Sequence, residues 1–307
     1  MATPRSQLVD PEAPLVYHIV SRCVRRAWLC GTDAGRNYDH RKVWLESRLL
    51  RLSAAFAVEL YGYAIMSNHF HLILRYDPSA ATQWTDEEVV DRWLDCCRLS
   101  LEPDTDESDA QLELMRLQLM ANKPKLERIR RQLGSLSSFM KHLKQPIAWR
   151  ANREDNCKGH FFEGRFYSGA LLDDTAVISA LAYVDLNPVR AKMVRRAVEA
   201  SYTSLSRRLD ALAADPARLD KYLAPIVSGL ADSTNQSKLT LPITLSAYLE
   251  YLEQFSLSDE TTIDKAQSWY QRVAMFKRHQ RAYGFGENIR KWAIQRGWSR
   301  LGVATPV

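Results

Sequence analysis

The stretch YGYAIMSNHFHLIL, residues 61 to 74, constrains the fold of this chain more than any other. Its apolar ends are typical of a buried strand, yet its centre reads His69-Phe70-His71. Because alternate residues of a strand point to the same face, we expect both imidazoles on one face and Phe70 on the other, with the core. The spacing alone leaves two interpretations open: the rings share one divalent metal ion, or they are hydrogen-bonded structural histidines.

Strand-like and helical segments surround this stretch. Residues 15–20 are rich in β-forming residues, and residues 40–60 repeat apolar residues at helical spacing. Residues 159–172 predict a turn and then a strand, and 173–194 predict a helix that Pro188 bends or ends. Strand, helix and strand in this order indicate an α+β sandwich.

Composition excludes several classes of protein. The chain has 307 residues, 46% of them hydrophobic, so it can bury a full core. It has no apolar run of the roughly 20 residues that span a bilayer and no signal-peptide pattern, so we expect no membrane partner. Its cysteines form no CxxC pair, which favours reduced thiols in a cytoplasmic protein; they are Cys23, Cys30, Cys96, Cys97 and Cys157.

The net charge of +6 is unevenly distributed. The charged residues of 84–113 are eleven acidic and two basic, so we expect a solvated helical insertion over about 78–133. The chain after 205 has helical patterns, and in 265–307 aromatic residues are interspersed among basic ones. The sequence therefore predicts an α+β domain over 1–204 and a basic helical domain over 205–307 that gives auxiliary DNA binding.

A third metal ligand has to come from outside the histidine stretch. The chain has no HExxH or HxHxDH motif and no cysteine-rich partner set, which argues against the hydrolytic zinc frameworks. An amide or carboxylate ligand would suit magnesium or manganese. In LAYVDLNPVRAKMV, Tyr183 and Asn187 lie on one face of a helix. Each alone is also compatible with a core aromatic residue and a helix-ending turn.

Four blocks together resemble the single-tyrosine HUH transposases, most closely the REP-associated tyrosine transposases of the IS200-like type. They are VYHIVSRCVRR (16–26), MSNHFHLIL (66–74), GHFFEGRF (159–166) and LAYVDLNPVRAKMV (181–194). The resemblance covers about residues 15–200. The chain departs from the family pattern modestly, with Cys23 where relatives often have glycine.

This resemblance implies a ferredoxin-like (RRM-like) antiparallel sheet sandwich with the HUH motif on a central strand, plus a C-terminal mainly helical extension. It also implies that His69, His71 and Asn187 hold Mg²⁺ or Mn²⁺, and that Tyr183 is the nucleophile. Such enzymes cut single-stranded DNA beside a hairpin through a 5′-phosphotyrosine, need no nucleotide cofactor, and act as monomers or homodimers. A bacterial, nucleoid-associated location in the cytoplasm follows from such a role.

Several basic residues are candidate phosphate contacts, although basic surface residues are usually only solvated. They are Arg22, Arg25, Arg26, Lys141, Lys144, Arg150, Arg165, Lys277, Arg278 and Arg281. The other histidines are expected to have surface or structural roles; they are His18, His40, His142, His160 and His279.

The leading hypothesis is a metal-dependent single-strand DNA endonuclease and strand transferase that recognises hairpins such as REP-type repeats. The alternative is a domesticated protein that binds hairpin DNA and regulates without cutting, although a pure binder has no need of His69, His71, Tyr183 and Asn187 together. A third interpretation, a helical interaction protein with a structural histidine pair, does not explain the four ordered blocks.

Overall fold

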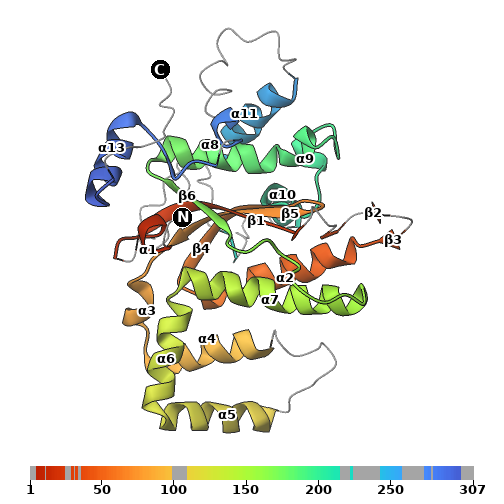
Figure 1. Cartoon of the computed structure of the whole chain (residues 1–307). Helices are drawn as coiled ribbons and strands as arrows, with labels where there is room; N and C mark the ends of the chain where they lie inside the picture. The colour runs from red at the N-terminus through yellow and green to blue at the C-terminus, as the bar shows by residue number, and fades with distance from the viewer. Residues whose placement is uncertain are drawn as a thin grey trace.

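The computed structural model describes residues 5–10, 12–24, 29–30, 32–33, 36–98, 109–214, 222–223, 243–257, 273–277 and 279–298. The α+β prediction is confirmed, because helices cover both faces of a five-stranded mixed sheet (Figure 1). The strands follow the order β4-β5-β1-β6-β7 across the sheet. They are β1 (Leu15–Arg22), β4 (Val58–Ile65), β5 (His69–Tyr76), β6 (Tyr167–Leu171) and β7 (Ala282–Tyr283).

The helices form layers on the two faces of the sheet. On one face lie α2 (His40–Ala55) and α7 (Leu136–Glu154), and beyond them the helices of the acidic insertion (Figure 1). These are α3 (Ala80–Gln83), α4 (Asp86–Arg98), α5 (Asp109–Ala121) and α6 (Lys123–Leu133). The other face is crossed by α8 (Asp174–Asp185), which leads into the short α9 (Asn187–Arg190) (Figure 1).

The remaining elements are short or follow α9 in the chain. Three helices come from the C-terminal part of the chain: α10 (Ser204–Ala214), α11 (Leu245–Leu257) and α13 (Gly286–Gln295). The short elements are α1 (Arg5–Leu8), β2 (Thr32–Asp33), β3 (Arg36–Asn37) and the 3₁₀ turn η2 (Ala197–Glu199). Among the described residues, no helix has the length and apolar character that crossing a bilayer requires.

Each face of the sheet has its own hydrophobic core, because side chains alternate along every strand. Tyr17, Ile19 and Leu72 belong to the core under α2 and α7. Ile73 and Leu171 belong to the second core, with α8 and residues of α11. Complete burial of side chains of this size contributes about 1.5–3 kcal/mol each, so both faces stabilise the sheet.

The stretch 61–74 is two strands and not one, so that part of the prediction is wrong. β4 ends at Ile65 and β5 begins at His69, and the two pair antiparallel. The Met66 backbone N–H donates to the His69 carbonyl (2.8 Å), which closes the turn. Ser67 and Asn68 supply the turn, since both residue types favour local hydrogen bonding over an extended ladder.

Two further expectations differ from the structure. The helix predicted over 40–60 ends at Ala55, because Phe56 is extended and Val58 opens β4. The sheet was expected to be antiparallel, but β7 pairs parallel to β6 through Ala170 with Ala282 and Leu171 with Tyr283. A strand of two residues is too short to leave an alternating pattern in the sequence, so β7 could not be read from it.

Candidate metal and nucleophile site

Strand β5 presents His69 and His71 on the sheet face that α8 covers. Phe70, between them, is buried in the opposite core with Leu72. The two imidazole rings lie with their centroids 4.9 Å apart at an interplanar angle of 77°. His71 is buried, whereas His69 is half-buried at the strand end, where Arg22 of β1 is its pairing partner.

Helix α8 brings Tyr183 to these rings. Asp173 caps the helix, since its side chain accepts a hydrogen bond from the Ala176 backbone N–H (2.9 Å). Gly62 lets the helix approach β4 closely, because a Cβ at Gly62 would overlap the Leu181 side chain. Two residues before the helix ends at Asp185, the Tyr183 ring lies 5.7 Å from the His71 ring, centroid to centroid.

Asn187, the first residue of α9, closes the other side of His71. Its Nδ2 lies 2.9 Å from His71 Nε2, although the two residues are 116 positions apart in the sequence. The structure therefore brings His69, His71, Tyr183 and Asn187 together at one place on the sheet. Helix α8 ends at Asp185, and Pro188 lies in the first turn of the separate helix α9, which agrees with the helix end expected at that proline.

His18 of β1 belongs to the same site, which sequence reasoning missed. It is completely buried, and its Nε2 lies 2.9 Å from His71 Nδ1. The two imidazoles are stacked, 5.2 Å between centroids and 13° between planes. A surface role is wrong for His18. The sequence signal was its place in the strand block VYHIV, but the register that sets β1 beside β5 is not readable from one sequence.

The hydrogen bonds of His71 fix which nitrogen carries its proton. Asn187 donates through Nδ2, so His71 Nε2 accepts and the His71 proton lies on Nδ1. That N–H donates to His18 Nε2, which leaves the His18 proton on Nδ1. His18 Nδ1 is buried without a hydrogen-bond partner in the described part of the chain.

His69 carries its proton on the same nitrogen. Its Nδ1 lies 2.7 Å from Asn68 Oδ1, which can only accept, so the His69 Nδ1–H donates to that oxygen. Both rings of the pair therefore present a lone pair on Nε2. Histidines that bind metal ions usually donate their other ring N–H to a hydrogen-bond acceptor, as both rings do here through Nδ1.

All three histidines are neutral at pH 7. Burial, and then the charge of His279, lower the pKa of His18 to about 3. Burial and then the Arg22 guanidinium lower the pKa of His69 to about 4. Burial also holds the pKa of His71 well below its ordinary value. Neutral imidazole is the form that binds a metal ion, so these shifts suit a ligand pair.

Opposing effects act on the Tyr183 phenol. Burial raises its pKa above the ordinary value of 10, while the charges of Arg190 and Arg22 and a hydrogen bond with Asn187 act to lower it. The Arg190 guanidinium carbon lies 5.0 Å from the centre of the Tyr183 ring. The phenol is therefore protonated at neutral pH, and in this form it is a weak nucleophile.

The donor set fits a divalent cation with an amide as third ligand. The described residues contain no group of three or more His, Cys, Asp or Glu that could hold a metal ion. His69 and His71 each offer a nitrogen lone pair, and half a turn of the Asn187 side-chain amide would present its oxygen instead of its nitrogen. Two imidazoles and one amide leave open positions that water and a phosphate oxygen can fill.

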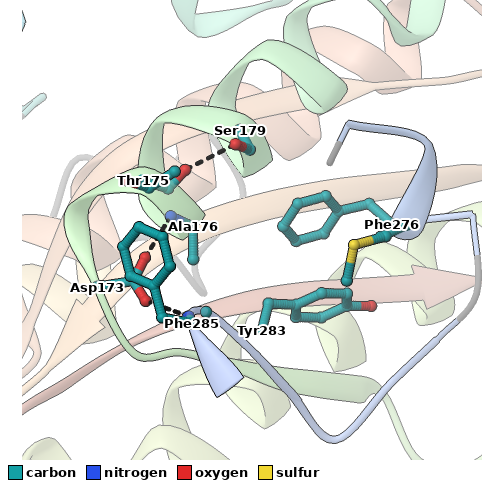
Figure 2. A pocket seen from close by; sticks show the side chains of 9 residues that line it. Asp173, Thr175, Ala176, Ser179, Phe276, Tyr283 and Phe285 are labelled. Atoms are coloured by element: carbon teal, nitrogen blue, oxygen red, sulfur yellow. Dashed lines mark hydrogen bonds between the residues drawn. The ribbon is translucent and has the colours of Figure 1, made fainter. Parts of the chain in front are cut away.

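The C-terminal part of the chain forms a wall of this site. The Phe276 ring lies 5.5 Å from the His18 ring and 5.7 Å from the Tyr183 ring, centroid to centroid. Phe276 stacks on Tyr283 of β7 at 4.1 Å, and Figure 2 shows these two rings beside α8. They line a small hollow of about 30 Å³ under the start of α8. No pattern in the sequence associates Phe276 with Tyr183.

Comparison with known proteins gives one structural likeness. No family model matches the sequence, and no curated protein matches it. Among solved structures, the chain is similar to a REP-associated tyrosine transposase bound to a REP hairpin, with a TM-score of 0.37. The identity is 12%, over 64% of this chain and 79% of that chain. This is the family that the four sequence blocks resemble.

The predicted DNA-contacting residues fall into three places. Arg22 ends β1 beside His69. Lys141, Lys144 and Arg150 lie on α7 and Arg165 in the loop before β6, on the face of the sheet away from α8. Lys277 and Arg281 are exposed near β7. Three of the predicted residues, Arg25, Arg26 and Arg278, lie outside the described residues.

Proposed function

We propose that this chain is a single-strand DNA endonuclease and strand transferase of the HUH tyrosine type, acting beside hairpins such as REP-type repeats. The observation that carries the proposal is the convergence of Tyr183 and Asn187 with His69 and His71, from a helix and a strand far apart in the sequence. The order strand-helix-strand-strand-helix-strand of β1, α2, β4, β5, α7 and β6 supports a ferredoxin-like core, with the histidines on a strand that is paired on both sides.

In the proposed reaction, the Tyr183 oxygen attacks a backbone phosphorus of single-stranded DNA. A bond forms between the phenol oxygen and phosphorus, and the bond from phosphorus to the preceding 3′ oxygen breaks. The phenol proton is released to solvent, and the departing 3′ oxygen takes up a proton and becomes a hydroxyl. The 5′-phosphotyrosine keeps the energy of the phosphodiester, so a second 3′-hydroxyl can reverse the step without a nucleotide cofactor.

His69, His71 and Asn187 would hold the divalent cation, magnesium or manganese. Such a cation makes the phosphorus more electrophilic and stabilises negative charge on the phosphate oxygens. His18 and Asn68 keep both Nε2 lone pairs directed to it by holding the Nδ1 protons. Arg190 and Arg22 place positive charge near the phenol, where it stabilises a developing phenolate.

The two parts of the chain divide this work in the proposal. Residues 1–204 hold the metal ligands and the nucleophile. Residues 205–307 add basic surface for DNA, and in addition they contribute Phe276 to the wall behind Tyr183.

The test is adduct formation with Tyr183→Phe, which keeps the ring and removes only the hydroxyl. A labelled hairpin oligonucleotide with a single-stranded flank is incubated with Mg²⁺ or Mn²⁺ and analysed on a denaturing gel. We expect a covalent protein–DNA adduct for the unaltered chain, at least 100-fold less for Tyr183→Phe, and none with chelator, with DNA binding retained.

The matched control is Tyr38→Phe, which makes the same change at a tyrosine near α2 that stacks on Arg41, and its adduct level should equal that of the unaltered chain. An adduct that persists in Tyr183→Phe would rule out the assigned nucleophile. Tight hairpin binding without adduct, over a broad set of hairpins and both metals, would favour the non-cutting DNA-binding protein.

A further inference from the structure

A second candidate site for DNA lies on the opposite side of the sheet from Tyr183. It is a groove of about 530 Å³ between α7 and the loop 159–166 that leads into β6. In Figure 1 the chain after α7 turns back beside that helix before it enters β6. The volume lies within the roughly 300–1,000 Å³ of sites that hold small organic ligands, so a base with its sugar and phosphate fits.

The groove has a fixed framework. The Asn152 side-chain amide donates to the Gly159 carbonyl (2.9 Å) and ties the loop to α7. Phe161 and Phe162 are buried, and their backbone joins β1: the Val24 N–H donates to the Phe161 carbonyl at 3.0 Å. A site with such anchored walls loses little conformational entropy when it binds a ligand.

The lining combines positive charge with an exposed aromatic ring. Lys141, Lys144 and Arg165 line the groove, against a single carboxylate, Glu163. Trp149 lines it as well and is 64% exposed, the most exposed tryptophan among the large exposed apolar side chains described. Cations around an exposed aromatic ring are the combination that binds unpaired nucleotides.

The loop beside the groove is joined by backbone pairing to the strands of the candidate nucleophile site. Arg22 of β1 is the pairing partner of His69, and the Glu163 backbone N–H donates to the Arg22 carbonyl (2.7 Å). The loop is thus two strand spacings, about 10 Å, from His69. A DNA strand that passes from the reacting phosphate over Arg22 would reach the groove within a short distance.

We infer that this groove binds the single-stranded DNA flank, with bases stacked on Trp149 and phosphates held by Lys141, Lys144 and Arg165. The inference rests on the proposed function for its choice of substrate, and it adds a place on the protein for the part of the strand that is not being cut. Duplex DNA does not fit this role, because its bases are already stacked on one another.

The experiment measures binding of fluorescein-labelled dT12 by anisotropy, in chelator and in the Tyr183→Phe background, so that cutting plays no part. We expect Trp149→Ala to weaken dT12 binding roughly 5- to 150-fold, because one base–aromatic stack is worth about 1–3 kcal/mol and 1.4 kcal/mol is tenfold. Binding of a 12-base-pair duplex should be unchanged. Lys141→Gln should reduce the slope of log K against log salt by about 0.7.

Two variants serve as controls. Trp149→Phe keeps a ring in the groove and should retain most of the affinity. Leu117→Ala removes a side chain of similar exposure (60%) from α5 in the acidic insertion and should change nothing. With 5-iodouracil in place of one thymine, photo-cross-linking should attach the oligonucleotide within residues 137–166.

The possible failures are distinguishable. If Trp149→Ala binds dT12 as the parent does, or the cross-links map elsewhere, the groove assignment is wrong, whatever the adduct experiment shows. If dT12 binding depends on Trp149 but the unaltered chain forms no Tyr183 adduct with any hairpin, the groove stands and the cutting function is refuted. Selective binding of an acidic peptide in place of dT12 would also overturn the inference.

Discussion

At the scale of the residue, His71 is the side chain on which the site depends. Each of its ring nitrogens has one partner 2.9 Å away, His18 on Nδ1 and Asn187 on Nε2. Because the ring is buried, it has no water to replace either partner. The hydrogen bond that His71 donates to His18 therefore decides the direction in which the Nε2 lone pair of His71 points, and that lone pair is what a cation would use.

We expect His18→Phe to weaken Mn²⁺ binding about 10- to 100-fold, as happens in metal sites when the residue that hydrogen-bonds a metal ligand is lost. The substitution keeps a ring in the buried position but removes the acceptor for His71 Nδ1–H. The measurement is Mn²⁺ affinity by calorimetry or electron paramagnetic resonance, without DNA. Thermal unfolding of both chains checks that the fold persists.

His18→Gln is the informative comparison, because its side-chain oxygen can accept the His71 proton and should restore part of the affinity. His160→Gln, at an exposed loop position, should leave Mn²⁺ binding unaltered. Equal affinity in all three variants would contradict a positioning role for His18.

At the scale of the element, α8 is fastened at both ends, with Tyr183 close to the second. At its start, Asp173 accepts from the Ala176 N–H and also from the Phe285 N–H (2.7 Å), which ties α8 to the C-terminal segment (Figure 2). At its end, the buried Asp185 accepts from the Tyr248 hydroxyl of α11 at 2.6 Å. The helix that carries Tyr183 is thus held from outside the sheet.

Asp173→Ala should destabilise the protein by about 1–3 kcal/mol, since it removes a helix cap worth about 0.5–2 kcal/mol and the acceptor for Phe285 as well. Urea unfolding gives the loss, and hydrogen exchange should show faster exchange at residues 282–288 as well as at the start of α8. The neighbouring Asp174→Ala changes an exposed first-turn acid with no described cap bond and should cost less. Equal losses in the two variants would argue against the tie.

The sequence predicted the elements whose local signals are strong. The Asp-Asp-Thr start signal of α8 corresponds to a real cap at Asp173, and alternation along β5 separates Phe70 from its two histidine neighbours. The sequence did not predict the contacts that depend on how distant segments pack together. The His18–His71 hydrogen bond depends on the register of β1 against β5, and Phe276 reaches Tyr183 only because β7 joins the sheet. Neither relation leaves a periodic pattern in one sequence.

At the scale of the whole molecule, acidic side chains concentrate on α4 and basic side chains concentrate near the C-terminal elements β7 and α13. The helices of the acidic insertion lie beyond α2 and α7, whereas the basic C-terminal elements lie on the side of α8 (Figure 1). Some basic residues are engaged within the protein: Arg281 lies over the Trp298 ring (4.5 Å), and Lys291 pairs with Glu287 (2.7 Å). Lys277 and Arg290 are exposed.

A triple variant, Lys277→Gln, Arg281→Gln and Arg290→Gln, should weaken DNA binding and flatten its salt dependence. Each lost phosphate contact removes about 0.7 from the slope of log K against log salt for single strands. Substitution is preferable to deletion, because the C-terminal segment also packs against His18 and Tyr183. The control is Lys125→Gln, at an exposed position of α6 in the insertion. An unchanged slope in the triple variant would contradict DNA binding by this region.

The protein should lose stability as pH falls below about 6.5, because it keeps buried histidines neutral. His142 shows this away from the site: burial among Phe56 and Trp93 lowers its pKa, aided by the charges of Arg48 and Lys141. The unfolded chain then binds more protons than the folded one, so stability is present above pH 6.5 and declines below it.

The variant His142→Leu measures how much His142 contributes to the loss of stability at low pH. The urea midpoint of this variant should fall less between pH 7 and pH 5 than that of the unaltered chain, whereas His160→Gln should follow the unaltered chain. A variant that is as acid-sensitive as its parent would mean that His142 does not contribute.

The place of Phe276 has a consequence for how the protein is made. The ring that closes the space behind Tyr183 comes from a part of the chain synthesised long after β5 and α8. His69, His71 and Tyr183 therefore emerge from the ribosome before Phe276 has been synthesised. A message cut short before codon 276 would yield a product with that space open to water.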